Sequence, residues 1–229
     1  MDRKIIYWSF SRTLLLVLFL LLVFVTSLLF IGAIGLAFKR IGFSPQLTMF
    51  ILVATFAGSY INIPLFSVKT FSPTIKDEYV SFFGIDFRIP QIEYEEFSTI
   101  IALNIGGALI PTFVSIYLLL KMPSTILYVL TGIVIVALVT HLFAKPVKGL
   151  GIVTPAFIPP LTAAIVAYIL PSNAPAIIAY TSGVLGTLIG ADISNLHKIP
   201  RLGARIASIG GAGTFDGIFL SGIISVLLV

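Results

Sequence analysis

Long apolar segments alternate with short polar stretches along most of the chain. Seven segments are each close to the roughly 20 residues that a helix needs to cross a bilayer. They run over about Leu14–Phe38, Ser44–Phe66, Thr99–Leu120, Ile126–Ala144, Ile152–Leu170, Pro175–Ile193 and Ile209–Val229. The pattern predicts an all-α polytopic integral membrane protein of about seven transmembrane helices, forming a single membrane domain over residues 1–229. Pro155, Pro159 and Pro160 predict a kink or break in the fifth segment.

The composition supports a membrane location and narrows the chemistry. The 229 residues are 58% hydrophobic and 10% charged, too little charge for a soluble domain of this size. Cysteine is absent, which excludes a disulfide framework, a cysteine nucleophile and a thiolate metal site. The net charge of +5 reflects lysines and arginines around the apolar segments and does not indicate nucleic-acid binding. Membrane lipid is the expected surrounding partner, and no metal or cofactor is predicted.

Basic residues predict the orientation of the chain in the cell membrane. Positive residues collect on the cytoplasmic side of membrane proteins, and a cytoplasmic N-terminus places eleven inside against three outside. The eleven are Arg3, Lys4, Arg12, Lys69, Lys76, Arg88, Lys145, Lys148, Lys198, Arg201 and Arg205, and the three are Lys39, Arg40 and Lys121. The loop 195–208 is then cytoplasmic and Val229 lies outside.

The main hydrophilic stretch, residues 67–98, follows the second apolar segment. Within it Ile85, Phe87 and Ile89 alternate with polar residues, which is the period of a strand, and Tyr79–Phe83 precedes them across Gly84. The pattern predicts a short β-hairpin. Two roles stay open for it: a structured cap over the helix ends, or an element that binds an extended substrate.

Asp192 and Asp216 are the two acidic residues that fall within predicted spans. A carboxylate inside a membrane is costly and therefore suggests a function. Asp216 stands thirteen residues before Val229 and Asp192 seventeen after Pro175, so at about 1.5 Å per residue both lie in the same, cytoplasmic half of the bilayer. The region 175–229 is therefore the candidate catalytic pair of helices.

Small residues on these two helices predict a close approach. Ser182, Gly186 and Gly190 form one ladder, and Gly217 and Ser221 form another. Two carboxyl groups brought together cannot both ionise easily and hold one proton between them. Such a pair supplies a base that activates water and an acid that protonates a carbonyl or leaving nitrogen.

Two aspartates on sequential helices, the second after Gly211–Ala212–Gly213, resemble the GxGD-type aspartyl proteases: presenilins, signal peptide peptidases and prepilin peptidases. Asp192–Ile193 followed by Ile199–Pro200 is similar to the prepilin-peptidase pattern, although Thr214 and Phe215 separate the second aspartate from its glycine. The architecture is also similar to a family of prokaryotic polytopic membrane proteins of unknown function. The resemblance implies cleavage of a transmembrane peptide or protein substrate without a metal or cofactor. It implies catalytic roles for Asp192 and Asp216, and substrate binding by Gly211, Gly213, Pro155, Ala156 and Phe157.

Two alternatives remain open on the sequence. The same aspartates suit an ion- or proton-coupled transporter, with Asn62, Asn104 and Pro111 along a polar pathway. In a structural or assembly role, Asp216 would be a helix N-cap and Asp192 would pair with Lys198 or Arg201. His141 and His197 lack the spacing of a metal site, and the oligomeric state is not predicted.

Overall fold

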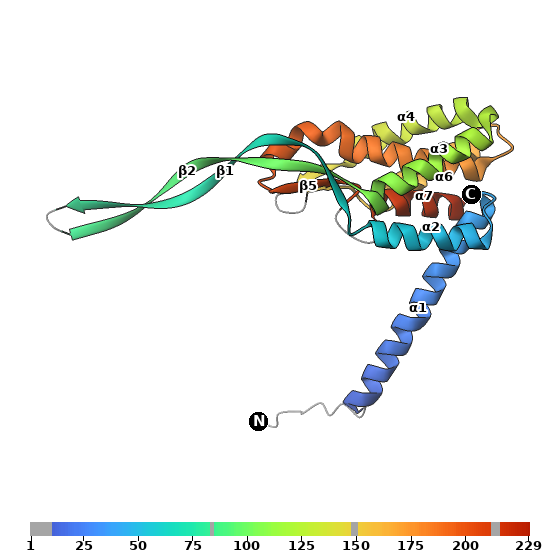
Figure 1. The fold of residues 1–229 in the computed structure, drawn as a ribbon, viewed down its shortest axis with the longest axis horizontal. Coiled ribbons are helices and arrows are strands. Elements are labelled where there is room, and N and C mark those ends of the chain that lie inside the picture. Colours follow the sequence, from blue (N-terminus) through green and yellow to red (C-terminus); the bar gives the residue numbers. More distant parts are fainter. Residues whose placement is uncertain (1–10, 83–84, 148–150, 212–215) are drawn as a thin grey trace, which may run out of the picture.

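A helical body and a long β-hairpin make up the molecule (Figure 1). The computed structural model describes residues 11–82, 85–147, 151–211 and 216–229. Its α-helices are α1 (Arg12–Arg40), α2 (Pro45–Gly58), α3 (Ile110–Lys121), α4 (Ile126–Phe143), α5 (Ile158–Ile169), α6 (Pro175–Thr187) and α7 (Gly217–Leu228). Four short helices adjoin them: η1 (Ile105–Leu109), η2 (Pro123–Thr125), η3 (Leu188–Asp192) and η4 (Ile193–Arg201). The strands are β1 (Asn62–Phe82), β2 (Ile85–Asn104), β3 (Lys145–Val147), β4 (Gly151–Val153) and β5 (Ile206–Ile209).

Three helices of the described chain are long and apolar enough to cross a membrane, and they indicate a membrane protein. They run over Arg12–Arg40, Pro123–Phe143 and Pro175–Pro200. The prediction of seven spanning helices is wrong. The other four apolar helices are shorter: Pro45–Gly58, Ile105–Lys121, Ile158–Ile169 and Gly217–Leu228. Parts of their apolar segments form strands instead, because β-branched and aromatic residues suit both structures and apolarity alone does not separate them.

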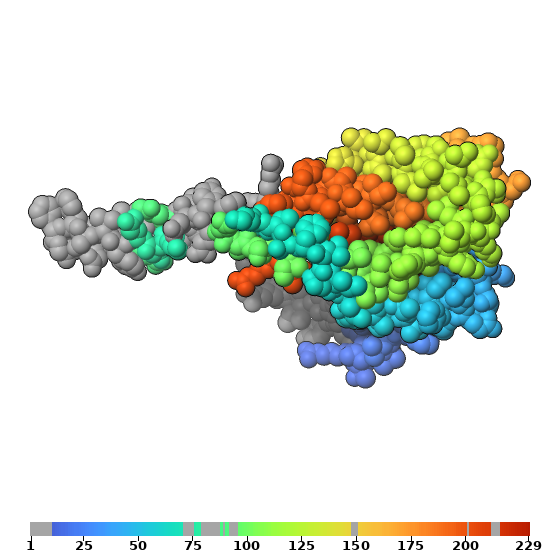
Figure 2. Space-filling model, turned by 45° about the horizontal axis from the view of Figure 1, so that its top comes forward, coloured from blue at the N-terminus to red at the C-terminus, as the bar shows by residue number. Residues whose placement is uncertain are grey.

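The all-α prediction is also wrong. The predicted hairpin around Gly84 exists, with Tyr79 opposite Arg88 and Phe82 opposite Ile85. It is far longer than expected, because β1 and β2 stay paired as far as Asn62 opposite Asn104, inside two segments for which the sequence predicts helices. β5 adds to β2 in parallel and completes a three-stranded sheet in the order β1–β2–β5. Figure 2 shows the hairpin projecting from one end of the helical body.

Charged side chains pair across the exposed part of the hairpin. Lys69 lies 2.6 Å from Glu96, and Arg88 pairs with Asp77. The hydrogen bond and the charge of Glu96 raise the pKa of Lys69. Because these groups are exposed to water, such pairs contribute little to stability.

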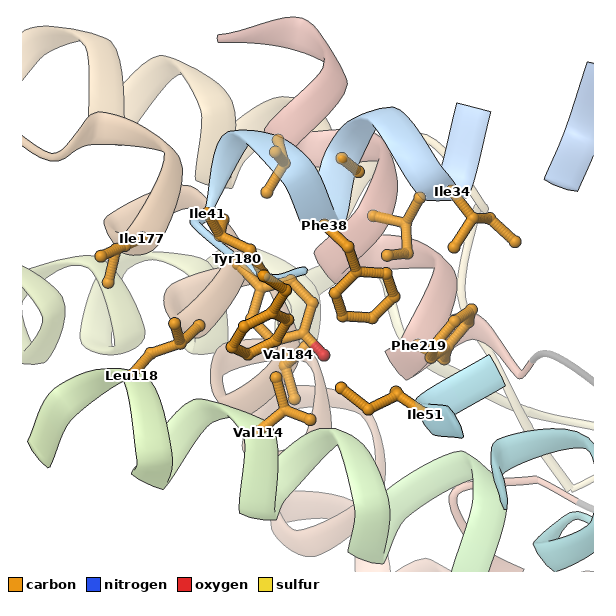
Figure 3. Close-up of a cluster of buried hydrophobic side chains, with 14 of the residues drawn as sticks. Ile34, Phe38, Ile41, Ile51, Val114, Leu118, Ile177, Tyr180, Val184 and Phe219 are labelled. Atoms are coloured by element: carbon orange, nitrogen blue, oxygen red, sulfur yellow. The ribbon is translucent and has the colours of Figure 1, made fainter. Parts of the chain in front are cut away.

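The largest apolar core lies where α1, α3, α6 and α7 meet (Figure 3). Tyr180, Phe38 and Phe219 are fully buried there, and the rings of Phe38 and Phe219 lie 6.4 Å apart between centroids. From Arg12 to Gly32 every residue of α1 is exposed. Only the C-terminal part of α1 therefore packs on the other helices.

Three basic residues lie together at one end of the helical body. Lys39, Arg40 and Lys121 lie at the end where α1 and α3 finish, whereas the hairpin extends from the opposite end.

Although α7 has only 12 residues, Arg40 at the end of α1 donates to the carbonyl oxygens of Val226 and Leu227. We therefore still expect a reporter fused after Arg201 to lie in the cytoplasm and one fused after Val229 to lie outside, because positive residues are retained on the cytoplasmic side. Protease protection of both fusions measures this. Both reporters on one side would show that the last segment does not cross.

Candidate functional site

Asp192 is the last residue of the π-helical turn η3, which continues α6 and is followed by the 3₁₀ helix η4. The Asn195 amide stabilises this change of helix type by donating to the carbonyl oxygens of Gly190 and Ala191 at 3.0 and 2.8 Å. Asp192 Oδ2 accepts a hydrogen bond of 2.7 Å from the backbone N–H of Gly210. The aspartate is therefore tied directly to the segment that follows β5.

Hydrogen bonds between polar side chains and backbone groups join α6 to α7, in addition to the close packing of small residues that the sequence predicts. Thr187 donates to Ser221 at 3.0 Å, Ser221 donates to the Gly183 carbonyl at 3.1 Å, and Ser225 donates to the Ala179 carbonyl at 2.9 Å. These residues are buried, so the bonds fix the two helices side by side.

The ladder Ser182, Gly186 and Gly190 packs against α4. A Cβ at Gly186 would meet Val136 at 2.6 Å, and one at Gly190 would meet Thr140 at 2.8 Å. The small residues thus permit close packing, as predicted, but with a different helix. The i, i+4 spacing shows that these small residues lie on one face of the helix. It does not show which helix packs against that face.

Asp216 lies at the start of α7 with φ −59° and ψ 164°. Its carboxylate is close enough to interact with the N–H groups of Gly217 and Ile218, yet it forms no N-cap hydrogen bond. Asp216 therefore occupies the N-cap position that a structural role predicts, but its side chain does not make the capping hydrogen bond. The carboxylate packs against Gly211, where an added Cβ would lie 2.6 Å from Asp216 Cγ.

Gly210 and Gly211 bring the two aspartates to one place. Both glycines have positive φ, 84° and 74°, a conformation that glycine adopts without strain. Asp192 accepts a hydrogen bond from the N–H of Gly210, and the Asp216 carboxylate packs against the α-carbon of Gly211. Neighbouring residues of one turn thus hold both carboxylates.

Asp192 and Asp216 line one pocket of about 270 Å³. Its remaining lining is mostly apolar and comes from β4, η4, β5 and the turns beside them: Gly151, Ile152, Leu196, Ile199, Leu202, Ala204, Ile206, Ala207, Ser208, Ile209 and Gly211. Both aspartates are partly exposed. The site therefore combines two carboxylates with an apolar wall.

The edge of the sheet leads directly to Asp192. Ile100 N–H donates to the Arg205 carbonyl at 3.0 Å, and Ile100 pairs with Ile206 in parallel register. In a parallel ladder, the backbone N–H and C=O groups of every second residue of β5 bond to β2. Those of Ile206 and Ser208 therefore point away from β2, towards the free edge of the sheet. The next outward-facing N–H is that of Gly210, which Asp192 occupies.

The other predicted substrate-binding positions are distributed differently. Gly211 lines the pocket, whereas Gly213 lies outside the described residues. Pro155, Ala156 and Phe157 are exposed in the turn before α5, with Phe157 67% exposed, and they do not line this pocket. The sequence reasoning missed β5 and the apolar residues of η4, because four residues are too few for a strand period to be recognised.

Several residues that the transporter and structural alternatives single out, and also His141, form hydrogen bonds with nearby residues. Asn104 is fully buried, donates to the Ser59 carbonyl and to Asn62, and accepts from Gly107 N–H at 2.7 Å. Lys198 donates to Asn195 at 2.6 Å, and His141 shares a hydrogen bond with Ser194. Among the residues that the structure describes, no group of three or more His, Cys, Asp or Glu is placed to hold a metal.

The fold and site thus define a helical membrane protein with two carboxylates beside the edge of a small sheet. The pattern of the DUF1614 family, described as a protein of unknown function, matches residues 56–228. The chain therefore belongs to the DUF1614 family. No protease family matches, and neither a curated protein nor a solved structure matches the chain. The first helix that is long and apolar enough to cross a membrane, α1, precedes the matched region.

Proposed function

We propose that this protein is an intramembrane aspartyl protease that uses Asp192 and Asp216 to hydrolyse a peptide bond of a membrane-embedded protein. The observation that carries the proposal is the convergence of the two carboxylates on Gly210 and Gly211 in one pocket. Carboxylates that share a site hold one proton between them.

Such a pair can perform both proton transfers of peptide hydrolysis. The ionised carboxylate takes a proton from water as the water oxygen attacks the peptide carbonyl, and the protonated partner donates its proton to the carbonyl oxygen. As the tetrahedral intermediate collapses, one of its hydroxyl groups gives its proton to the ionised aspartate and the carbonyl reforms. The C–N bond breaks, and the nitrogen leaves with the proton of the other aspartate. The products are one carboxyl and one amino terminus, and the two aspartates return to their starting state.

An extended substrate has a natural place beside β5. A strand that pairs with the outward-facing groups of Ile206 and Ser208 would run towards Gly210, where Asp192 lies. Main-chain pairing of this kind binds peptides largely independently of their side chains. The apolar wall of Leu196, Ile199 and Leu202 would then accept the side chains of a membrane protein. We therefore place the extended substrate at the edge of β5 and not at the tip of the hairpin, because β5 leads directly to Gly210, which is bonded to Asp192.

Ile206→Pro tests this edge. Proline lacks the N–H that faces outwards but fits an edge strand, so we expect kcat/KM for a membrane substrate to fall about five- to tenfold, the effect of about one hydrogen bond. Ile206→Ala is the matched control, because it removes the 61% exposed side chain and keeps the N–H. Equal activity of the two variants would exclude main-chain pairing at this position.

A further inference from the structure

The two π-helical turns of the described chain, η1 and η3, both contact Gly210. The last residue of η3 is Asp192, which accepts the hydrogen bond from the Gly210 N–H. The other turn, η1, lies against the carbonyl oxygen of Gly210 through its residue Gly107. Turns of this type are rare and often accompany functional sites. Both sides of the residue that holds Asp192 are therefore set by irregular helix.

The fit between η1 and the glycine turn leaves no space for a side chain. A Cβ added to Gly107 would overlap the Gly210 carbonyl oxygen and would lie 3.1 Å from Asp216 Cβ. A Cβ added to Gly210 would lie 2.5 Å from Ala108 Cβ. Atoms packed this closely transmit a displacement, because there is no free volume into which they relax. A movement of η1 therefore moves Gly210, and with it Gly211, which packs against Asp216.

The side chain of Asn104 holds η1 in place. Asn104 is the last residue of β2 and is fully buried. Its side-chain oxygen accepts a hydrogen bond of 2.7 Å from the Gly107 N–H, and its amide group donates to the Ser59 carbonyl at 2.8 Å and to Asn62 Oδ1 at 3.1 Å. The oxygen and both amide hydrogens are thus in use. A side chain that satisfies a free N–H at the start of a helical turn stabilises that turn.

We infer that Asn104 is a positioning residue for the aspartate pair. By holding η1, it fixes the turn of Gly210 and Gly211, against which both aspartates lie. The inference rests on the proposed function, since it concerns the pair that would transfer the protons. Loss of the Asn104 oxygen should slow the chemical step. It should not weaken the binding of a strand at β5, where Ser208 keeps its bond to Asn62.

Asn104→Ala and Asn104→Ser test the inference as a matched pair in the full-length protein. Both lack the amide group, but the Ser hydroxyl can still accept from the Gly107 N–H, as capping residues do. We expect Asn104→Ala to lower kcat for a membrane substrate about 100-fold, the effect of a misplaced reacting group. Asn104→Ser should recover about tenfold of this loss, the effect of one capping bond. KM should stay within about twofold of the wild type in both variants, because only the chemical step is affected.

Ser225→Ala is the control for a loss of stability. It also removes a buried hydrogen bond, from Ser225 to the Ala179 carbonyl at 2.9 Å, but at about 13 Å along α7 from Asp216. We expect Tm in detergent to fall by about 2 to 8 °C in this variant and in Asn104→Ala, since each loses buried hydrogen bonds. Only Asn104→Ala should lose kcat.

Three results would overturn the inference and leave the proposed function in place, provided that the wild type cleaves and Asp192→Asn does not. The first is the same kcat in Asn104→Ala and Asn104→Ser. The second is an equal fall of kcat in Ser225→Ala, which would indicate a general loss of stability. The third applies even if Asn104→Ala does not fold: a loss of kcat of about 100-fold in a folded Asn104→Ser, which keeps the capping bond. No cleavage by the wild type would end both the proposed function and the inference.

Discussion

Replacement of Asp192 or Asp216 by Asn is expected to lower the rate of membrane-substrate cleavage by at least about 10³-fold, within the range of general acid–base catalysis. Each variant loses one of the two groups that exchange protons, so neither retains half of the activity. Cleavage of a single-span membrane protein, followed in vesicles for the wild type and for Asp192→Asn and Asp216→Asn, measures the effect.

The same two variants should remain folded. Asn keeps the shape of Asp, and its side-chain oxygen can still accept the hydrogen bond from Gly210. Loss of a partly buried charge also removes a desolvation cost, so Tm in detergent should stay within a few degrees of the wild type. Unchanged cleavage in either variant would end the protease proposal. Loss of ion-coupled flux in vesicles, with no cleavage by the wild type, would identify a transporter instead.

Gly211→Ala is expected to reduce cleavage by about 100-fold, the order of effect that a misplaced reacting group produces. The added Cβ would lie 2.6 Å from Asp216 Cγ, and Gly211 has φ 74°, where alanine is strained. The Asp216 carboxylate must therefore move from its place beside Gly211. Cleavage rates and Tm of the variant separate this displacement from a loss of folding.

Gly217→Ala is the matched control for Gly211→Ala. It changes the residue directly after Asp216, but an added Cβ there meets nothing within 4 Å and the backbone has no positive φ. We expect nearly wild-type cleavage from it. Equal losses in the two variants would show that the region tolerates no substitution and that the contact between Gly211 and Asp216 has no particular importance.

The sequence located the two aspartates because a carboxylate in an apolar segment stands out whatever the fold. It also located the turn of the hairpin at Gly84, since alternation on both sides is a local signal. It did not reveal that Ile63 and Leu103 pair in a sheet, because a run of apolar residues fits a buried helix and a buried strand equally well.

The parts of the site that were missed depend on contacts between distant segments. Ile206 pairs with Ile100 across about a hundred residues, and Gly210 meets Asp192 only after η4 and β5 have turned the chain back. Neither contact leaves a periodic trace in the sequence. Gly211 was identified through a resemblance to a motif, whereas its physical role follows from its positive φ and its closeness to Asp216.

Hydrolysis in H₂¹⁸O tests the central claim most directly. The purified protein is reconstituted into vesicles with the membrane proteins of cells that lack it, and the fragments are analysed by mass spectrometry. Direct attack by water predicts fragments whose new C-termini carry one ¹⁸O in the wild-type sample and are absent with Asp192→Asn. The same fragments in both samples, or none in the wild-type sample, would contradict the assignment of Asp192 and Asp216 as a proteolytic pair.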